Sequence, residues 1–129
     1  MPDPTSPDSN SPHLPVPTPA AGPSSNERTL ALVAHALSFV EGGVIGPLIL
    51  YLAKRDESEF VAFHALQSLY FGLLAVVVIG PIAFMTCGLG AVLVVPYLVY
   101  EAIACIEANS GNWYELPIVG PLALRSHHP

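Results

Sequence analysis

The chain alternates between long apolar runs and short polar segments. The apolar runs cover residues 30–53, about 57–85 and 89–106. A helix needs about 20 predominantly apolar residues to cross the hydrocarbon core of a bilayer. The pattern therefore predicts an all-α integral membrane protein with three hydrophobic helices, preceded by a disordered N-terminal tail.

The first apolar run contains weak helix formers at its middle, where Glu41 is followed by two glycines and then by Gly46 and Pro47. Two arrangements fit this interruption. The run is either one kinked span or two half-helices that form a re-entrant hairpin, which would change the topology. We favour the kinked span.

A charged turn separates the first two apolar runs. It packs five of the fourteen charged residues of the chain into six positions, namely Lys54, Arg55, Asp56, Glu57 and Glu59. Charged side chains are costly inside hydrocarbon, so this turn should lie on the water side of the membrane. Asp56 is expected to cap the next helix, with Glu59 as the third residue of its first turn.

The two ends of the chain differ from its middle. Eight prolines occur in residues 1–26. Because this segment has too few large apolar side chains to offset the entropy of folding, residues 1–27 are predicted to be a disordered tail. Residues 28–124 form the helical domain, and residues 125–129 a flexible C-terminus. Residues 118–124 are too short to cross a membrane, so they should lie along its surface or pack against the bundle.

Composition supports a membrane protein and excludes some partners. Only 11% of the residues are charged, against about 25% in a typical soluble domain. The net charge of −6 provides no basic stripe, so a nucleic-acid partner is not expected. The expected surroundings are the lipid bilayer, with other membrane proteins or further copies of the chain as partners.

Lysines and arginines set the expected orientation. In a three-span arrangement Arg28 lies on one side, and Lys54, Arg55 and Arg125 lie on the other. The positive-inside rule then places the charged turn and the C-terminus in the cytoplasm, and the expected location is a bacterial cytoplasmic membrane. A re-entrant first segment would place the N-terminal tail on the cytoplasmic side as well.

Polar residues within the apolar runs are the candidates for function, because they are expensive in a membrane unless paired or hydrated. They are His35, Glu41, His64, Gln67 and Glu101. Counted from the helix ends at the helical rise, His64 lies roughly 6 Å deep and Glu101 roughly 10 Å deep. We therefore expect these two side chains to approach each other. Glu41 lies deeper, and either faces a polar cavity or caps the halves of a broken helix.

Two groups of residues in the apolar runs are expected to share one face of a helix. His64, Gln67 and Ser68 share one helix face at i, i+3 and i+4, and Tyr97 and Glu101 belong to a stripe at i, i+4 spacing that is typical of helix packing. No serine or threonine has a histidine and a carboxylate placed to activate it, and no cysteine or histidine spacing suggests a metal. We expect no catalytic residues, no cofactor and no metal.

Three segments resemble the DUF4870 family. They are the start of the first apolar run (LALVAHALS, residues 30–38), residues 46–69 around the charged turn (GPLILYLAKRDESEFVAFHALQSL) and residues 114–120 (YELPIVG). Members are small, mostly bacterial membrane proteins that are described as similar to Tic20, a component of chloroplast protein import. The resemblance implies an all-helical membrane domain over roughly residues 28–124, and it implies no established activity. Glu59 departs from the proline that many members have there.

Two functions from different classes follow. The first is a non-enzymatic membrane component that packs against partner membrane proteins, in the Tic20-like interpretation as part of a translocation or envelope complex. The alternative is a small oligomeric transporter or channel that uses the buried Glu41, Glu101 and His64.

Overall fold

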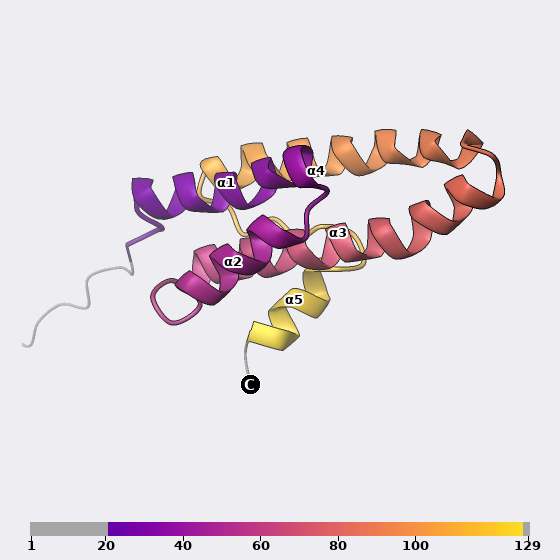
Figure 1. Cartoon of the computed structure of the whole chain (residues 1–129). Helices are drawn as coiled ribbons and strands as arrows, with labels where there is room; N and C mark the ends of the chain where they lie inside the picture. The colour runs from indigo at the N-terminus through magenta and orange to yellow at the C-terminus, as the bar shows by residue number, and fades with distance from the viewer. Residues whose placement is uncertain (1–20, 128–129) are drawn as a thin grey trace, which may run out of the picture.

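The fold, a computed structural model that describes residues 21–127, consists of helices joined by turns and irregular segments, with no strand among those residues. Its elements in chain order are α1 (Ser25–Glu41), α2 (Ile45–Lys54), α3 (Glu59–Met85), the 3₁₀ helix η1 (Leu89–Leu93), α4 (Val94–Asn109) and α5 (Gly120–His127) (Figure 1). Most of the predicted tail lies outside the described residues, and its last three positions, 25–27, are already helical. Residues 125–127, expected to be flexible, belong to α5.

The first apolar run is divided into two helices, so the expectation of one kinked span is wrong. α1 ends at Glu41, and the next two residues, Gly42 and Gly43, adopt left-handed backbone angles with φ of 84° and 81°. Such angles suit glycine and reverse the chain. Figure 1 shows α2 running back beside α3 toward the charged turn, which is the re-entrant arrangement.

Two helical segments, Glu59–Met85 and Leu89–Asn109, are long and apolar enough to cross a membrane. They form a long hairpin whose turn, residues 86–88, carries no charge. The expected third spanning helix is replaced by the shorter pair α1 and α2. α2 is apolar but has only ten residues, which is too short for a span.

The start of α1, the charged turn and the end of α4 meet at one end of the molecule, here called the charged end. The Ser58 hydroxyl donates a hydrogen bond of 2.6 Å to Glu27 Oε1 of α1. The side chain of Arg28 lies against Gly111, just after α4. The N-terminal end of α1 is therefore on the same side as the charged turn.

The cap of α3 is Ser58, not Asp56 as expected. Ser58 has an extended backbone, and its hydroxyl accepts the backbone N–H of Val61. The helix starts at Glu59, so Asp56 and Glu57 stay in the turn, where Glu57 pairs with Lys54 and Asp56 lies 3.5 Å from Arg55. Four of the five charges of this turn thus pair with one another at the surface.

Ser58 links two helices at the charged end, so its loss should weaken both. The hydrogen bonds from Ser58 and from Ser24 lower the pKa of Glu27 below its ordinary value of 4.5. A carboxylate with a lowered pKa in the folded state contributes stability above its ordinary pKa, and this contribution is lost as the pH falls through the lowered value. We expect Ser58→Ala to cost about 1 kcal/mol of unfolding free energy at neutral pH.

Chemical unfolding in detergent at several pH values tests this. Ser58→Ala should also flatten the loss of stability below about pH 4.5, because the pKa of Glu27 then moves back toward its ordinary value. The matched control is Ser25→Ala, at the start of α1, where the serine hydroxyl makes no hydrogen bond to any of residues 21–127; it should change neither quantity. An unchanged acid dependence in Ser58→Ala would show that the hydrogen bond does not stabilise the carboxylate.

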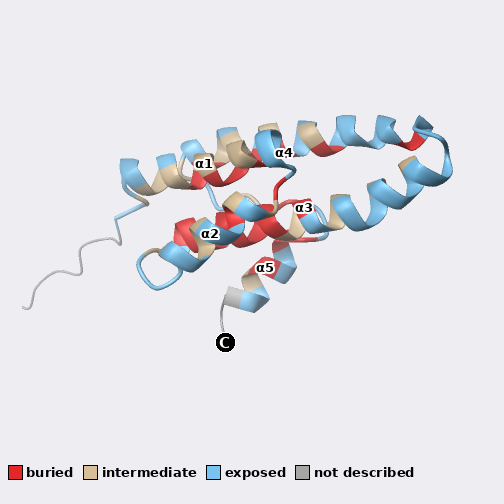
Figure 2. Cartoon of the chain, in the orientation of Figure 1, coloured by how far each residue is buried: buried red, intermediate tan, exposed pale blue. Residues whose placement is uncertain are grey.

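The core lies in the half of the α3–α4 hairpin nearest the charged end. There α1 covers α3 and α4, α2 and α5 pack on α3, and the buried residues gather between them (Figure 2). Beyond this core, residues 73–96 project as a two-helix extension, here called the far arm. Its side chains are apolar apart from Thr86, and most of them are uncovered; Val77, for example, is 68% exposed.

Candidate functional site

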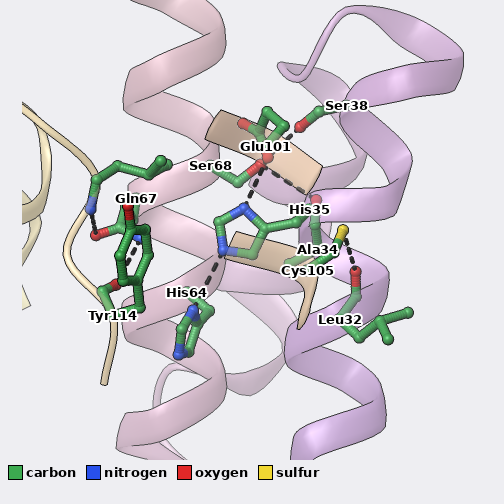
Figure 3. A network of polar contacts seen from close by, with 11 residues as sticks. Leu32, Ala34, His35, Ser38, His64, Gln67, Ser68, Glu101, Cys105 and Tyr114 are labelled. Atoms are coloured by element: carbon green, nitrogen blue, oxygen red, sulfur yellow. Dashed lines mark hydrogen bonds and ion pairs between the residues drawn. The ribbon is translucent and has the colours of Figure 1, made fainter. Parts of the chain in front are cut away.

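Three helices contribute polar side chains to one buried cluster between α1, α3 and α4 (Figure 3). The buried polar residues of the described chain are His35 and Ser38 of α1, His64, Gln67 and Ser68 of α3, and Glu101 of α4. This set includes no lysine or arginine. Polar groups buried in an apolar bundle must find partners within the protein, and most of these side chains do.

The spacing on α3 explains its three contributions. His64, Gln67 and Ser68 lie on one helix face, as the sequence predicts, and all three are fully buried. On α4 the stripe at i, i+4 spacing is also buried, with Tyr97 and Glu101 followed by alanines that let α1 approach closely. The polar face of α3 and the packing stripe of α4, both predicted from the sequence, therefore meet in the buried cluster.

Glu101, His35 and His64 form a continuous hydrogen-bonded chain. His35 Nδ1 lies 2.8 Å from Glu101 Oε2, and His35 Nε2 lies 3.2 Å from His64 Nδ1. His64 Nε2 donates to the backbone carbonyl of Asn112 at 3.0 Å. We expected the side chains of His64 and Glu101 to approach each other. In the structure His35 lies between them and links them, because the reversal after α1 brings this histidine to their level.

Two serines and a tyrosine extend the cluster toward the far arm. Ser68 donates to the backbone carbonyl of Ala34 at 3.2 Å, so the 2.7 Å contact between Ser38 and Ser68 uses the proton of Ser38. The Tyr97 hydroxyl and Glu101 Oε1 are buried and have no hydrogen-bond partner among the described residues. The cluster therefore has free hydrogen-bonding capacity at one end only.

Gln67 holds the segment that follows α4. Its amide nitrogen donates to the Tyr114 carbonyl at 3.0 Å, and its amide oxygen accepts the Leu116 N–H at 2.9 Å. Gln67 lies about 12 Å along α3 from the helix start, a depth at which non-helical backbone is tolerated only if the protein satisfies its polar groups. One side chain thus lets residues 112–119 pack beside α3.

Replacing Gln67 with leucine should release this segment. The substitution leaves the Tyr114 carbonyl and the Leu116 N–H without partners, and we expect a loss of about 2 kcal/mol of unfolding free energy. Amide hydrogen exchange at Leu116 should accelerate more than exchange within α4. Gln67→Glu keeps the acceptor and should protect the Leu116 amide better than Gln67→Leu does. Equal exchange at Leu116 in all three proteins would contradict this role.

Glu41 does not belong to the cluster. It is the last residue of α1 and is exposed in the isolated chain, and its carboxylate accepts the backbone N–H of Gly46 in the first turn of α2. Of the two sequence interpretations, the structure thus supports a carboxylate that caps a broken helix. The negative charge also lies at the N-terminal end of α2, which favours an anion.

Metal-ligating residues do not gather among residues 21–127. No group of three or more His, Cys, Asp or Glu side chains within that range is placed to hold a metal ion. Cys105 is half-buried, and its thiol contacts the Leu32 carbonyl at 3.8 Å, which is a helix-packing contact. The chemistry that this cluster supports is hydrogen bonding and proton binding.

The comparisons with known proteins identify a different family from the one expected. Residues 26–123 match MamF/MmsF, described as the magnetosome magnetite crystal formation protein family. A UPF0132 membrane protein of Archaeoglobus fulgidus is 34% identical over 109 residues, covering 70% of this chain and 89% of that protein. No solved structure matches. The resemblance to DUF4870 and the Tic20-like interpretation are therefore wrong.

Proposed function

Because the chain belongs to the MamF/MmsF family and its Archaeoglobus fulgidus relative is a membrane protein, we propose that it is a non-enzymatic membrane component that packs against partner membrane proteins. The far arm is the surface for these contacts. The buried polar cluster holds the helices of one chain together, and the partner helices lie on the arm beyond it.

The observation that carries this proposal is the uncovered far arm. Its apolar side chains extend past the point where α1, α2 and α5 end (Figure 2). A cleft of about 280 Å³ opens between α3 and α4 near the base of the arm and is lined by side chains such as Phe71, Val78 and Tyr100. Helices associate in membranes through close packing of such surfaces, because lipid provides no hydrophobic driving force.

The family description concerns magnetite crystal formation, and we do not extend a mineral-binding role to this chain. The described residues provide no cluster of metal ligands, and four of the five charges of the charged turn pair with one another. The proposal uses only the membrane location of the relatives. The Archaeoglobus fulgidus relative is described only as a membrane protein, and a packing role is compatible with both descriptions.

We also propose that the charged end faces the cytoplasm of a bacterial cell. With the first apolar run folded back, Arg28 lies on the same side as Lys54 and Arg55. The turn at the tip of the far arm contains no charged residue. The positive-inside rule therefore favours this orientation more strongly than it does in a three-span arrangement.

A small oligomeric transporter or channel is the second candidate. Its support is reduced, because Glu41 is a helix cap, but Glu101 and His64 remain buried and are linked through His35. Two spanning helices cannot enclose a pore alone, so this function requires several copies. Native mass spectrometry that finds only single chains would count against it.

Photo-crosslinking in intact membranes tests the packing role. A photoreactive amino acid at position 77, in the far arm, should yield discrete protein adducts of reproducible mass. The same group at position 52 of α2, where Leu52 is 56% exposed, is the matched control and should yield mainly lipid adducts. Lipid adducts alone at position 77 would overturn the proposal.

A further inference from the structure

We propose that Glu101, His35 and His64 form one binding site for a proton, which is shared by the three side chains and exchanges with water at the charged end. The ligand is H⁺. This inference is independent of the packing role, because it concerns the buried cluster and not the far arm.

The hydrogen positions follow from the chemistry of the partners. The Asn112 carbonyl can only accept, so His64 Nε2 carries a hydrogen. In neutral His64 the other nitrogen, Nδ1, is then an acceptor, and His35 Nε2 must donate to it across 3.2 Å. The tautomers of both rings are thereby fixed by one backbone oxygen.

The contact between His35 and Glu101 then requires one further proton. His35 Nδ1 and Glu101 Oε2 are 2.8 Å apart, a separation at which two lone pairs cannot face each other. The proton lies either on the imidazole, giving an imidazolium and a carboxylate, or on the carboxyl group, giving two neutral partners. Both forms have the same proton count and no net charge.

Losing this proton would leave a single negative charge in the bundle. The buried polar residues of the described chain include no lysine or arginine that would neutralise it. The titratable groups that face Glu101 from the packed helices are His35 of α1, His64 of α3, and Tyr97 and Cys105 of α4. None is a permanent cation, so the counter-charge of Glu101 has to be a proton.

The chain of nitrogens provides a route to water. In the release step the shared proton stays on His35 Nδ1, the His35 Nε2 proton moves to His64 Nδ1, and the His64 Nε2 proton leaves to water beside Asn112. Both histidines end neutral with exchanged tautomers, and Glu101 is left as a carboxylate. Because a bare Nε2 cannot face a carbonyl oxygen, His64 Nε2 then exchanges its contact with the Asn112 carbonyl for a hydrogen bond that water donates. Asn112 is exposed at the charged end, so this exit faces water.

Nuclear magnetic resonance of the full chain in lipid nanodiscs tests the proposal, with ¹⁵N-labelled histidine and ¹³C-labelled glutamate carboxyls. We expect the ring nitrogens of His35 and His64 and the carboxyl of Glu101 to move together in one pH transition. Glu101→Gln keeps a hydrogen-bonding partner for His35 but holds no acidic proton, so the common transition should be lost. Glu115→Gln, at an exposed glutamate, is the matched control and should retain it.

Two results would overturn the proposal. One is that the two histidines titrate separately, each as an isolated imidazole, while the Glu101 carboxyl does not change. The other is that none of these signals moves anywhere in the pH range in which the chain stays folded, which would show a fixed hydrogen-bonded cluster. If Glu101→Gln fails to fold, His64→Leu serves instead. It should slow exchange of the His35–Glu101 proton with water, and unchanged exchange would exclude His64 as the exit.

Discussion

Replacing His35 with leucine is expected to lower the free energy of unfolding by about 3–5 kcal/mol, the range observed when one partner of a buried ion pair is removed. The substitution keeps the site filled with an apolar side chain, but it removes the partner that Glu101 Oε2 has among the described residues and the donor to His64 Nδ1. Unfolding in detergent, followed by circular dichroism, measures the loss.

A double variant separates the pair from the packing of α1. In His35→Leu/Glu101→Leu both partners are apolar, so no unpaired carboxyl remains in the core. Replacing both members of a buried pair by apolar groups is often neutral, and we expect the double variant to be more stable than His35→Leu alone. If the two substitutions destabilise additively, His35 and Glu101 are not coupled and the cluster is not a unit.

Gly72→Ala should be the most damaging small change in the apolar core. A methyl group added at Gly72 would lie 2.3 Å from the carbonyl oxygen of Gly43 and 2.6 Å from its carbonyl carbon. Both are backbone atoms of the left-handed turn that reverses the chain, so neither can move without disturbing α2. Overpacking typically costs 1–3 kcal/mol, and we expect a loss of about 3 kcal/mol here.

Gly80→Ala is the matched control in the same helix. A methyl group at Gly80 would meet nothing within 4 Å apart from the chain neighbours of Gly80, so the substitution creates no tertiary clash. Alanine is favoured over glycine within a helix by about 0.5–1 kcal/mol, whereas crowding against the ring of Pro81, the next residue, opposes this gain. Gly80→Ala should therefore change stability much less than Gly72→Ala. Equal losses in both variants would mean that α3 is sensitive to any substitution of glycine, and that the contact between Gly72 and Gly43 is not special.

The local elements were largely predictable from the sequence. The second and third apolar runs match α3 and the η1–α4 segment closely, because their length and apolar content leave a helix as the only way to satisfy the backbone in a membrane. The polar face formed by His64, Gln67 and Ser68 was also visible, since helix periodicity alone places these residues together.

The reversal after Glu41 was not predictable in the same way. Glycines at positions 42 and 43 permit a kink as readily as a chain reversal. Which of the two forms depends on the contact between Gly43 and Gly72, two residues that are far apart in the sequence. The role of His35 followed from that choice. In a kinked span, His35 and Glu101 would lie at different depths in the membrane. In the folded-back arrangement they lie at the same level and form a hydrogen bond. The family assignment was wrong: the resemblance to DUF4870 rested on three short segments, whereas the MamF/MmsF family model matches residues 26–123.

Cysteine labelling of intact membranes tests the central claim, the re-entrant α1–α2 hairpin, most directly. The natural Cys87 lies exposed at the turn between α3 and η1, and Cys105→Ser removes the second thiol. Cysteines at positions 26 and 57 are introduced singly, with Cys87 also replaced by serine. The account predicts that an impermeant reagent reaches positions 26 and 57 from one side of the membrane and Cys87 only from the other. Labelling of positions 26 and 57 from opposite sides would contradict it.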